Sequence, residues 1–269
     1  MKFRFIPAAL LSVVALTLTG CSASSADTDS ASGADDSLSS VLDSGTLTIG
    51  TEGTYRPFSF HEDGSGELTG YDVEVARAVA AELGVEAAFE ETQWDAIFAG
   101  LTAGRWDTIA NQVSITPERE EAYEFSTPYT YSTGVIVVPA DNTSITSFAS
   151  LEGKTTAQSL TSNWYTLATE SGATVEAVEG WAQSVALVEQ GRVDATVNDK
   201  LTFLDYQQTN GAKNLKIAAE TDDRSESAFA FAQDGTALAE AVTDALATLS
   251  SDGTLTELSE KYFGADVSQ

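Results

Sequence analysis

Basic residues are scarce in this sequence. The 269 residues include 13 lysines and arginines against 41 aspartates and glutamates, so the formal net charge is -28. The phosphate backbone of a nucleic acid would repel such a protein, and we therefore expect no nucleic-acid partner. The length and the 42% hydrophobic content are sufficient for one large domain or two of ordinary size.

Cysteine and histidine are almost absent. Cys21 is the only cysteine and His61 is the only histidine, so no disulfide forms within the chain and no cluster of these residues can hold zinc. We therefore expect no metal catalysis and no cofactor. A calcium site built from carboxylates stays open in so acidic a chain, although no acidic loop has the spacing of a calcium-binding hand.

The N-terminus has the features of an export signal. A basic start precedes an apolar run from Phe5 to Leu18, which is too short to cross a bilayer comfortably. The following Leu-Thr-Gly-Cys21 resembles the bacterial lipobox, whose cysteine is lipidated and becomes the mature N-terminus. We expect residues 1–20 to be a lipoprotein signal peptide and Cys21 to carry the lipid; the alternative is an ordinary core cysteine.

The residues after Cys21 are poor in apolar side chains. Residues 22–45 are mostly Ser, Ala, Asp and Gly, with too little apolar surface to fold. Residues 21–45 are therefore predicted to be the lipidated cysteine and a flexible acidic linker between the membrane and a folded domain.

From Thr46 onward, short apolar runs alternate with helical patterns. The predicted strands are 47–49, 85–91, 107–110, 129–139, 155–158, 175–178, 194–197 and 228–231, and the predicted helices between them are 71–83, 94–103, 162–170, 181–189 and 199–208. Such alternation favours parallel sheets covered by helices. In the first of these helices an apolar face opposes a polar face that carries Asp72, Glu74 and Arg77.

The pattern restarts after the extended segment 129–139, which predicts two α/β lobes. The last predicted strand is followed by an apolar stripe at helical spacing, formed by Leu238, Val242, Leu246 and Leu249. This C-terminal segment is too small to bury the stripe alone, so we expect it to pack on the first lobe. The predicted boundaries are 46–137 plus 229–269 for lobe 1 and 138–228 for lobe 2. A ligand cleft between lobes joined by two crossovers is the default expectation.

One arginine follows the predicted strand 107–110. Arg119 is the only basic residue in the polar stretch 111–119, and its guanidinium matches a carboxylate with two parallel hydrogen bonds. The stretch therefore offers a small-anion site. The alternative is that Arg119 pairs on a solvated helix face with a neighbouring acid, which would be Glu118, Glu120 or Glu121.

Several separated stretches resemble one protein family. They are residues 50–58 (GTEGTYRPF), 68–74 (LTGYDVE), 94–95 (WD), 114–119 (SITPER), 125–129 (FSTPY) and 191–195 (GRVDA). In this order they resemble the family 3 extracellular solute-binding proteins, the polar amino acid receptors of ABC importers, and an ordered set is more specific than any one motif. The resemblance implies a two-lobed periplasmic-binding-protein-like α/β fold of type II.

The resemblance also implies roles for individual residues. Arg119 would clamp the ligand carboxylate, with donors from Ser114 beside it. Thr161 and Ser162, at the start of a helix, would bind the same carboxylate. Asp199 would accept the ligand ammonium, although a cap for the following helix is its alternative role.

Other residues are implied to contact the ligand side chain. Tyr55 and Trp94 correspond to an aromatic pair that sandwiches it, although each type is more often a core residue. Glu52 matches a position that contacts the side chain in relatives, or else it is a solvated acid. Asn111 and Gln112 complete the predicted ligand-binding set.

One departure from the family bears on specificity. Where the family usually has Gln-x-Gly-Thr-Thr, residues 158–162 read Gln-Ser-Leu-Thr-Ser, so Leu160 replaces a glycine that can adopt backbone angles closed to leucine. With Leu160, the stretches 111–113 (NQV) and 198–200 (NDK) look like the subgroup that binds cystine or cysteine.

These features together predict capture of a polar amino acid, with L-cystine the first candidate. We expect a monomer on the outer face of the cytoplasmic membrane that delivers its ligand to an ABC permease and performs no chemistry. Ligand contacts on both lobes would drive closure. The alternative is an enzyme, because some relatives are dehydratases of cyclohexadienyl acids, and Glu52 is then the one candidate acid or base.

Overall fold

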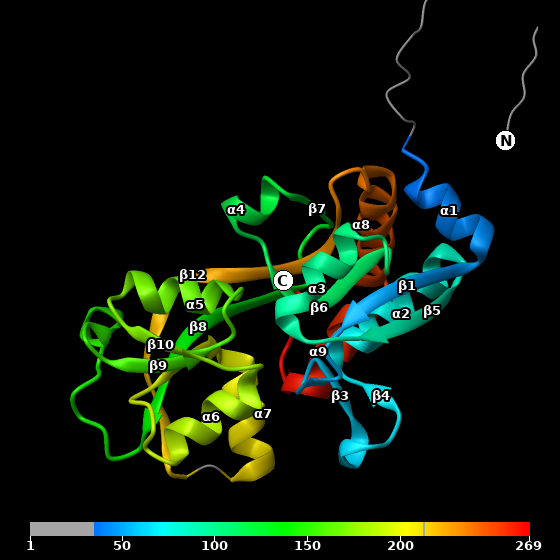
Figure 1. Ribbon diagram of the computed structural model, residues 1–269. Coiled ribbons are helices and arrows are strands. Elements are labelled where there is room, and N and C mark those ends of the chain that lie inside the picture. The colour runs from blue at the N-terminus through cyan, green and yellow to red at the C-terminus, as the bar shows by residue number, and fades with distance from the viewer. Residues whose placement is uncertain (1–34, 212) are drawn as a thin grey trace, which may run out of the picture. The chain divides into compact units, whose positions relative to one another are not determined.

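The computed structural model of the protein describes residues 35–211 and 213–269 (Figure 1). The predicted signal peptide, Cys21 and linker residues 22–34 lie outside the described residues. Within the described ranges no helix is long and apolar enough to cross a membrane.

A seven-stranded sheet runs through the described chain. Its strands are β1 (Thr46–Thr51), β5 (Glu86–Glu91), β6 (Thr108–Ser114), β7 (Tyr123–Phe125), β8 (Thr130–Pro139), β11 (Thr196–Asp199) and β12 (Leu215–Ala232). They lie in the order β11-β8-β12-β6-β1-β5, with β7 also paired to β12. β1 pairs in parallel with β5 and β6, as the alternation of strands and helices predicts, whereas β8 and β12 pair antiparallel.

Lobe 1 is built around β1, β5 and β6. Its helices are α2 (Tyr71–Leu83), α3 (Trp94–Thr102), the short α4 (Pro117–Glu120), α8 (Thr236–Ser251) and α9 (Thr254–Phe263), and a small sheet is formed by β2 (Thr54–Tyr55), β3 (Ser59–His61) and β4 (Leu68–Thr69), with the 3-10 turn η1 (Glu62–Gly64). α2 has its predicted bounds, because its apolar residues recur at helical spacing and Gly84 ends it in a left-handed conformation. The predicted apolar stripe of α8 is buried against α2 and α9.

Lobe 2 repeats the arrangement on a smaller scale. Its elements are β9 (Thr155–Gln158), β10 (Thr174–Ala177), the 3-10 turn η2 (Phe148–Leu151) and the helices α5 (Asn163–Glu170), α6 (Trp181–Glu189) and α7 (Lys200–Asn210). β9 and β10 pair in parallel, and β11 contacts β9. The core of this lobe includes Val135, Val185 and Val188.

Two long strands, β8 and β12, join the lobes (Figure 1). Their pairing runs from Leu215 opposite Pro139 to Ser227 opposite Thr130, with register shifts on the way. The predicted type II fold, with two crossovers between two α/β lobes, is confirmed. The exact lobe boundaries stay a prediction, since β8 and β12 take part in the sheet along their whole length.

The expected flexible linker ends earlier than residue 45. Residues Ser37–Ser44 form helix α1, which lies beside α8 (Figure 1). Val41 is 2% exposed in the main core, and Asp35 Oδ2 accepts a hydrogen bond of 2.5 Å from the N–H of Ala237 at the start of α8. The prediction fails for 37–44 because Val41 is buried, and Leu38 partly buried, against a helix nearly 200 residues further on. Two apolar side chains are too few to fold a helix alone.

Candidate ligand-binding site

A pocket of about 510 Å³ is lined by residues of both lobes, a volume in the usual range for a small-molecule site. From lobe 1 it is lined by Glu52, Thr54, Tyr55, Glu91, Thr92, Gln93, Trp94, Asn111 and Gln112, and from lobe 2 by Gln158, Ser159, Ser162, Asn163, Trp164, Glu179, Gly180, Trp181, Ala182, Gln183, Ser184, Val197 and Asn198. Most of these residues follow the carboxyl ends of strands or begin the next helix. The fold therefore brings polar chain ends of both lobes to one place.

The pocket lining is acidic and rich in amides. It contains the carboxylates of Glu52, Glu91 and Glu179 together with seven Asn and Gln side chains, and the described lining includes no Lys or Arg. Four aromatic side chains, Tyr55, Trp94, Trp164 and Trp181, supply its apolar walls. Such a lining suits a ligand that carries positively charged and hydrogen-bonding groups on an apolar stem.

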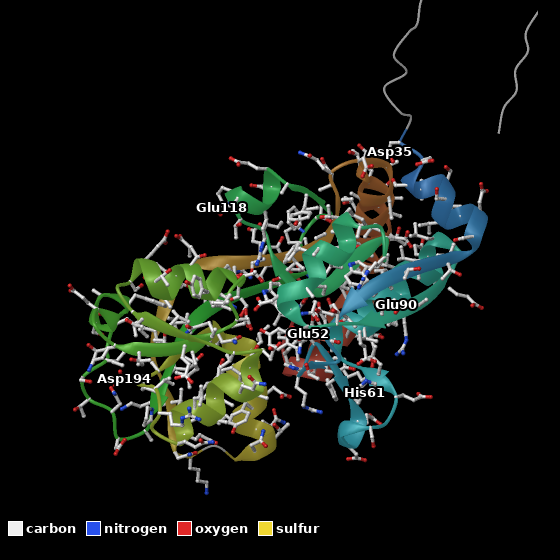
Figure 2. The ribbon with its side chains drawn as sticks, viewed as in Figure 1. Asp35, Glu52, His61, Glu90, Glu118 and Asp194 are labelled. Carbon is white, nitrogen blue, oxygen red and sulfur yellow. The ribbon has the colours of Figure 1, made fainter. Side chains whose placement is uncertain are left out.

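Glu52 is held at the end of β1 by its neighbour on β6. The Asn111 side-chain amide donates 2.7 Å to Glu52 Oε2, and the Glu52 N–H donates 2.8 Å to Asn111 Oδ1. Burial raises the pKa of Glu52 to about 7, with Asn111 opposing the rise and the charge of Asp95 adding to it. No basic side chain pairs with Glu52 in the described part of the chain. Figure 2 shows Glu52 where the lobes face each other.

The two predicted aromatic residues both line the pocket. Tyr55 bridges the lobes, since its hydroxyl donates 3.0 Å to Asn198 Oδ1 and accepts 3.0 Å from the Thr202 hydroxyl. Trp94 begins α3 and is 7% exposed, and its Nε1–H makes no hydrogen bond with the described chain. Gln158 Nε2, across the pocket on β9, is likewise unpaired among the described residues.

Gln112 lines the pocket in a left-handed conformation, with φ of 50°, which is uncommon for a residue other than glycine. Asp72 accepts hydrogen bonds from both the Gln112 N–H (2.6 Å) and its side-chain amide (2.7 Å). Burial raises the pKa of Asp72 to about 7 against these bonds. Asp72 was expected on the polar face of α2, but it is fully buried. Its position in the first turn of a helix was the available signal that it could bond backbone N–H groups.

Arg119 lies beside the pocket and does not line it. It is 9% exposed, and its Nη1 and Nη2 donate to the carbonyls of Ser114 (2.8 Å) and Thr161 (3.3 Å). The guanidinium lies over the adjacent rings of Trp94 and Phe98, 5.3 and 5.2 Å from their centroids. Burial lowers the pKa of Arg119 to about 10. The described residues give it no ion pair, so the alternative of a solvated pair with a neighbouring glutamate does not hold.

Of the remaining predicted residues, some line the pocket and others do not. Ser162 lines the pocket and caps α5 by accepting 3.1 Å from the Tyr165 N–H. The hydroxyl of Ser114 lies 3.1 Å from that of Ser225, outside the pocket lining. Thr161 also lies outside it and donates its N–H and hydroxyl to Asp95 Oδ1.

Asp199 acts as a helix cap, which was its alternative role. Its Oδ1 accepts 2.8 Å from the Leu201 N–H at the start of α7 and 2.8 Å from the Ser132 hydroxyl on β8. Burial raises the pKa of Asp199 to about 6. The adjacent Asn198, rather than Asp199, lines the pocket.

Sequence reasoning missed most of the lining that lobe 2 supplies. Gln158 and Asn198 stand in stretches compared with the family, yet only their neighbours were assigned to the ligand. Trp181 and Glu179 precede or begin a helix after a strand. That position was the one available signal, and it does not tell which side chains face the cleft.

The model of one family, the bacterial extracellular solute-binding proteins, family 3, matches residues 47–265. The chain belongs to this family. The predicted assignment is confirmed, and membership of an extracellular family places the folded domain outside the cytoplasm.

The chain is similar in sequence to one curated relative, and in sequence and fold to two solved structures. The L-cystine-binding protein TcyA of Bacillus subtilis (strain 168) is 47% identical over 260 residues, which cover 97% of this chain and 96% of that protein. The L-cystine solute receptor of Neisseria gonorrhoeae, in its unliganded open conformation, is 45% identical with a TM-score of 0.59, covering 86% of this chain and 99% of that one. An ancestral arginine-binding protein bound to arginine is 33% identical with a TM-score of 0.77, covering 82% of this chain and 99% of that one.

These relatives are binding proteins, so the prediction that this family member is a solute-binding protein and not an enzyme is confirmed. The backbone matches the arginine-bound protein better than the open receptor, although the open receptor is closer in sequence. The lobes are therefore arranged more as in a bound relative, in agreement with the hydrogen bonds that Tyr55 and Thr161 make across the cleft.

Proposed function

We propose that the protein captures an amino acid that carries a second ammonium group, with L-cystine the first candidate, for an ABC permease. The observation that carries the proposal is the pocket lining: three carboxylates, seven amides and no basic side chain in its described residues. L-cystine has a zwitterion at each end of an apolar disulfide stem, so it offers an ammonium to each end of such a pocket. The names of the Bacillus subtilis and Neisseria gonorrhoeae relatives support the same ligand.

Glu52 is the proposed partner of one ammonium group. Its carboxylate lines the pocket and has an amide partner but no cation among the described residues. A charged carboxylate left in this state is costly, and an ammonium within hydrogen-bond distance removes much of that cost. Tyr55, Trp94, Asn111, Gln112 and Ser162 are the other predicted residues that line the pocket, and we propose direct ligand contacts for them.

Arg119 is the proposed partner of the ligand carboxylate. It is buried without an acidic partner in the described chain, and its two hydrogen bonds leave other N–H donors of the five-donor fork unused. Ser114 fixes the guanidinium through its carbonyl. Asp199 is proposed for the second ammonium, because its two hydrogen bonds both end on Oδ1.

Capture works by closure of the lobes in this proposal. A ligand that touches both linings binds the closed form better than the open form, and a preference of about 5 kcal/mol moves such an equilibrium from mostly open to mostly closed. The hinge is formed by β8 and β12. The permease would recognise the closed state.

The proposal extends to the N-terminus. Residues 1–20 are cleaved as a signal peptide, Cys21 is lipidated and holds the monomeric protein on the outer face of the cytoplasmic membrane. Mass spectrometry of the protein from membranes tests this: a diacylglyceryl adduct on a mature N-terminal Cys21 is expected, and an intact N-terminus would overturn it.

Calorimetric titration tests the ligand. Residues 22–269, unfolded and refolded to remove bound ligand, are titrated with L-cystine, L-cysteine, glutamine and arginine. Saturable binding of L-cystine at one site is expected, with at least tenfold weaker binding of L-cysteine, which lacks the second ammonium. Tighter binding of a monoamino acid would contradict the two-ammonium proposal, and no binding of any amino acid would contradict amino acid capture.

A further inference from the structure

A carboxylate of lobe 1 is bonded to a loop of lobe 2 outside the pocket. Asp95, the second residue of α3, accepts hydrogen bonds at Oδ1 from the N–H (3.0 Å) and the hydroxyl (2.7 Å) of Thr161. Thr161 lies in the turn between β9 and α5. Both residues are exposed, and neither lines the pocket.

Each partner stands next to a residue that does line the pocket. Asp95 follows Trp94, and Thr161 precedes Ser162. The two hydrogen bonds therefore join the lobes at the edge of the pocket while leaving its volume open to a ligand. The contact spans the cleft, so it is made when the lobes are closed and is lost when they separate.

We propose that the Asp95–Thr161 pair is a latch that stabilises the closed state and slows ligand release without touching the ligand. Two hydrogen bonds to one carboxylate, both present only on closure, favour the closed form over the open form. A latch of this kind raises the closed fraction of the free protein and thereby its apparent affinity.

The latch also reassigns Thr161. The family resemblance implies that its hydroxyl and N–H bind the ligand carboxylate, yet here both donors are used by a carboxylate of the protein itself. Thr161 is therefore a positioning residue for closure. The inference rests on the proposed function only for the identity of the ligand.

The test measures the rate of ligand release and the energetic coupling between Asp95 and Thr161. Asp95→Ala removes both bonds, Thr161→Val removes the hydroxyl bond, and Asp95→Asn keeps an oxygen acceptor. With L-cystine as the probe, Asp95→Ala is expected to weaken binding about tenfold, mainly through faster dissociation, and Asp95→Asn less. Thr161→Val should weaken binding when Asp95 is present. It should have no further effect when it is added to Asp95→Ala. Glu240→Ala, which removes an exposed helical acid of lobe 1, is the matched control and should change nothing.

Two outcomes would overturn the latch. One is unchanged or slower dissociation in Asp95→Ala. The other is an equal loss from Thr161→Val with and without Asp95, which would return Thr161 to the ligand carboxylate.

A second readout needs no ligand. Glu82→Cys on α2 and Glu170→Cys on α5 place one exposed thiol on each lobe for a pair of dyes, since residues 22–269 contain no other cysteine. Energy transfer in the free protein should report a smaller closed fraction after Asp95→Ala than after Glu240→Ala. Equal closed fractions would overturn the latch even if L-cystine proves not to be the ligand.

Discussion

Glu52 and Asn111 hold each other across neighbouring strands. The Asn111 amide donates 2.7 Å to Glu52 Oε2 and accepts 2.8 Å from the Glu52 N–H, so the carboxylate is oriented before a ligand arrives. A preorganised carboxylate in a pocket without a described basic residue is a strong partner for an ammonium group.

Glu52→Gln should weaken binding of L-cystine by about 10- to 100-fold, because it removes the charge of a hydrogen-bond acceptor but keeps an oxygen for Asn111. Calorimetry at pH 8 measures the change. Glu240→Gln, on the solvent face of α8, is the matched control. An unchanged affinity in Glu52→Gln would exclude Glu52 as the partner of an ammonium.

Binding should also strengthen as pH rises through about 7. The pKa of Glu52 in the free protein is raised to about 7 by burial, so the ionised form that pairs with an ammonium is the minor form at pH 6 and the major form at pH 8. Affinity measured from pH 5.5 to 8 tests this dependence, and Glu52→Gln should flatten it. A wild-type affinity that falls over this range would contradict the prediction.

Asp72 should make the protein less stable as pH rises. Its pKa is raised from 3.8 to about 7 by burial, so between about pH 4 and pH 7 the folded state holds a proton that the unfolded state releases, and the free energy of unfolding falls as pH increases. The full effect is on the order of 4 kcal/mol. Urea unfolding from pH 4 to 8 should show this slope, and Asp72→Asn should reduce it. Equal slopes in the wild type and in Asp72→Asn would contradict a raised pKa for Asp72.

Arg119→Lys should lower ligand affinity by at least about tenfold despite keeping the charge. A lysine lacks the planar fork that donates to the carbonyls of Ser114 and Thr161 and leaves donors for a carboxylate. Calorimetry gives the affinity, and circular dichroism checks that the variant is folded. A folded variant with wild-type affinity would show that Arg119 serves packing against Trp94 and Phe98 only.

Helix α1 contributes to stability through a single buried side chain. Val41 is 2% exposed and Leu42 is 48% exposed, so Val41→Ala should lower the free energy of unfolding by about 1 to 2 kcal/mol. Leu42→Ala should have almost no effect and is the matched control. Equal losses in urea unfolding would contradict the packing of α1 against α8.

Short-range sequence patterns predict most of the helices and strands. They fail where an element is stabilised by a segment that is distant in the sequence. The bounds of α2, α6 and β9 agree with prediction because each depends on the spacing of apolar residues along a few turns or alternations. Strand β12 is much longer than the predicted 228–231. Its middle, residues 220–227, is polar and charged, and this part is extended because it pairs with β8.

The candidate site also has residues that local sequence predicts and residues whose position depends on distant contacts. Six of the ten predicted binding residues line the pocket, since motif order indicates which loops end near the cleft. Four do not line it: Ser114, Arg119, Thr161 and Asp199. The direction in which each of these side chains points depends on groups from other elements, such as the rings beside Arg119 and the Asp95 carboxylate that binds Thr161.

The sequence by itself determined the family, the two α/β lobes and the absence of a disulfide, because these follow from local periodicity, motif order and residue counts. Only the tertiary structure decided that Asp72 is buried, that Gln158, Trp164 and Trp181 line the pocket, and that Thr161 donates its hydrogen bonds to Asp95. Burial and hydrogen-bond partners arise from contacts between elements far apart in the chain, and such contacts leave no periodic signal in the residues that make them.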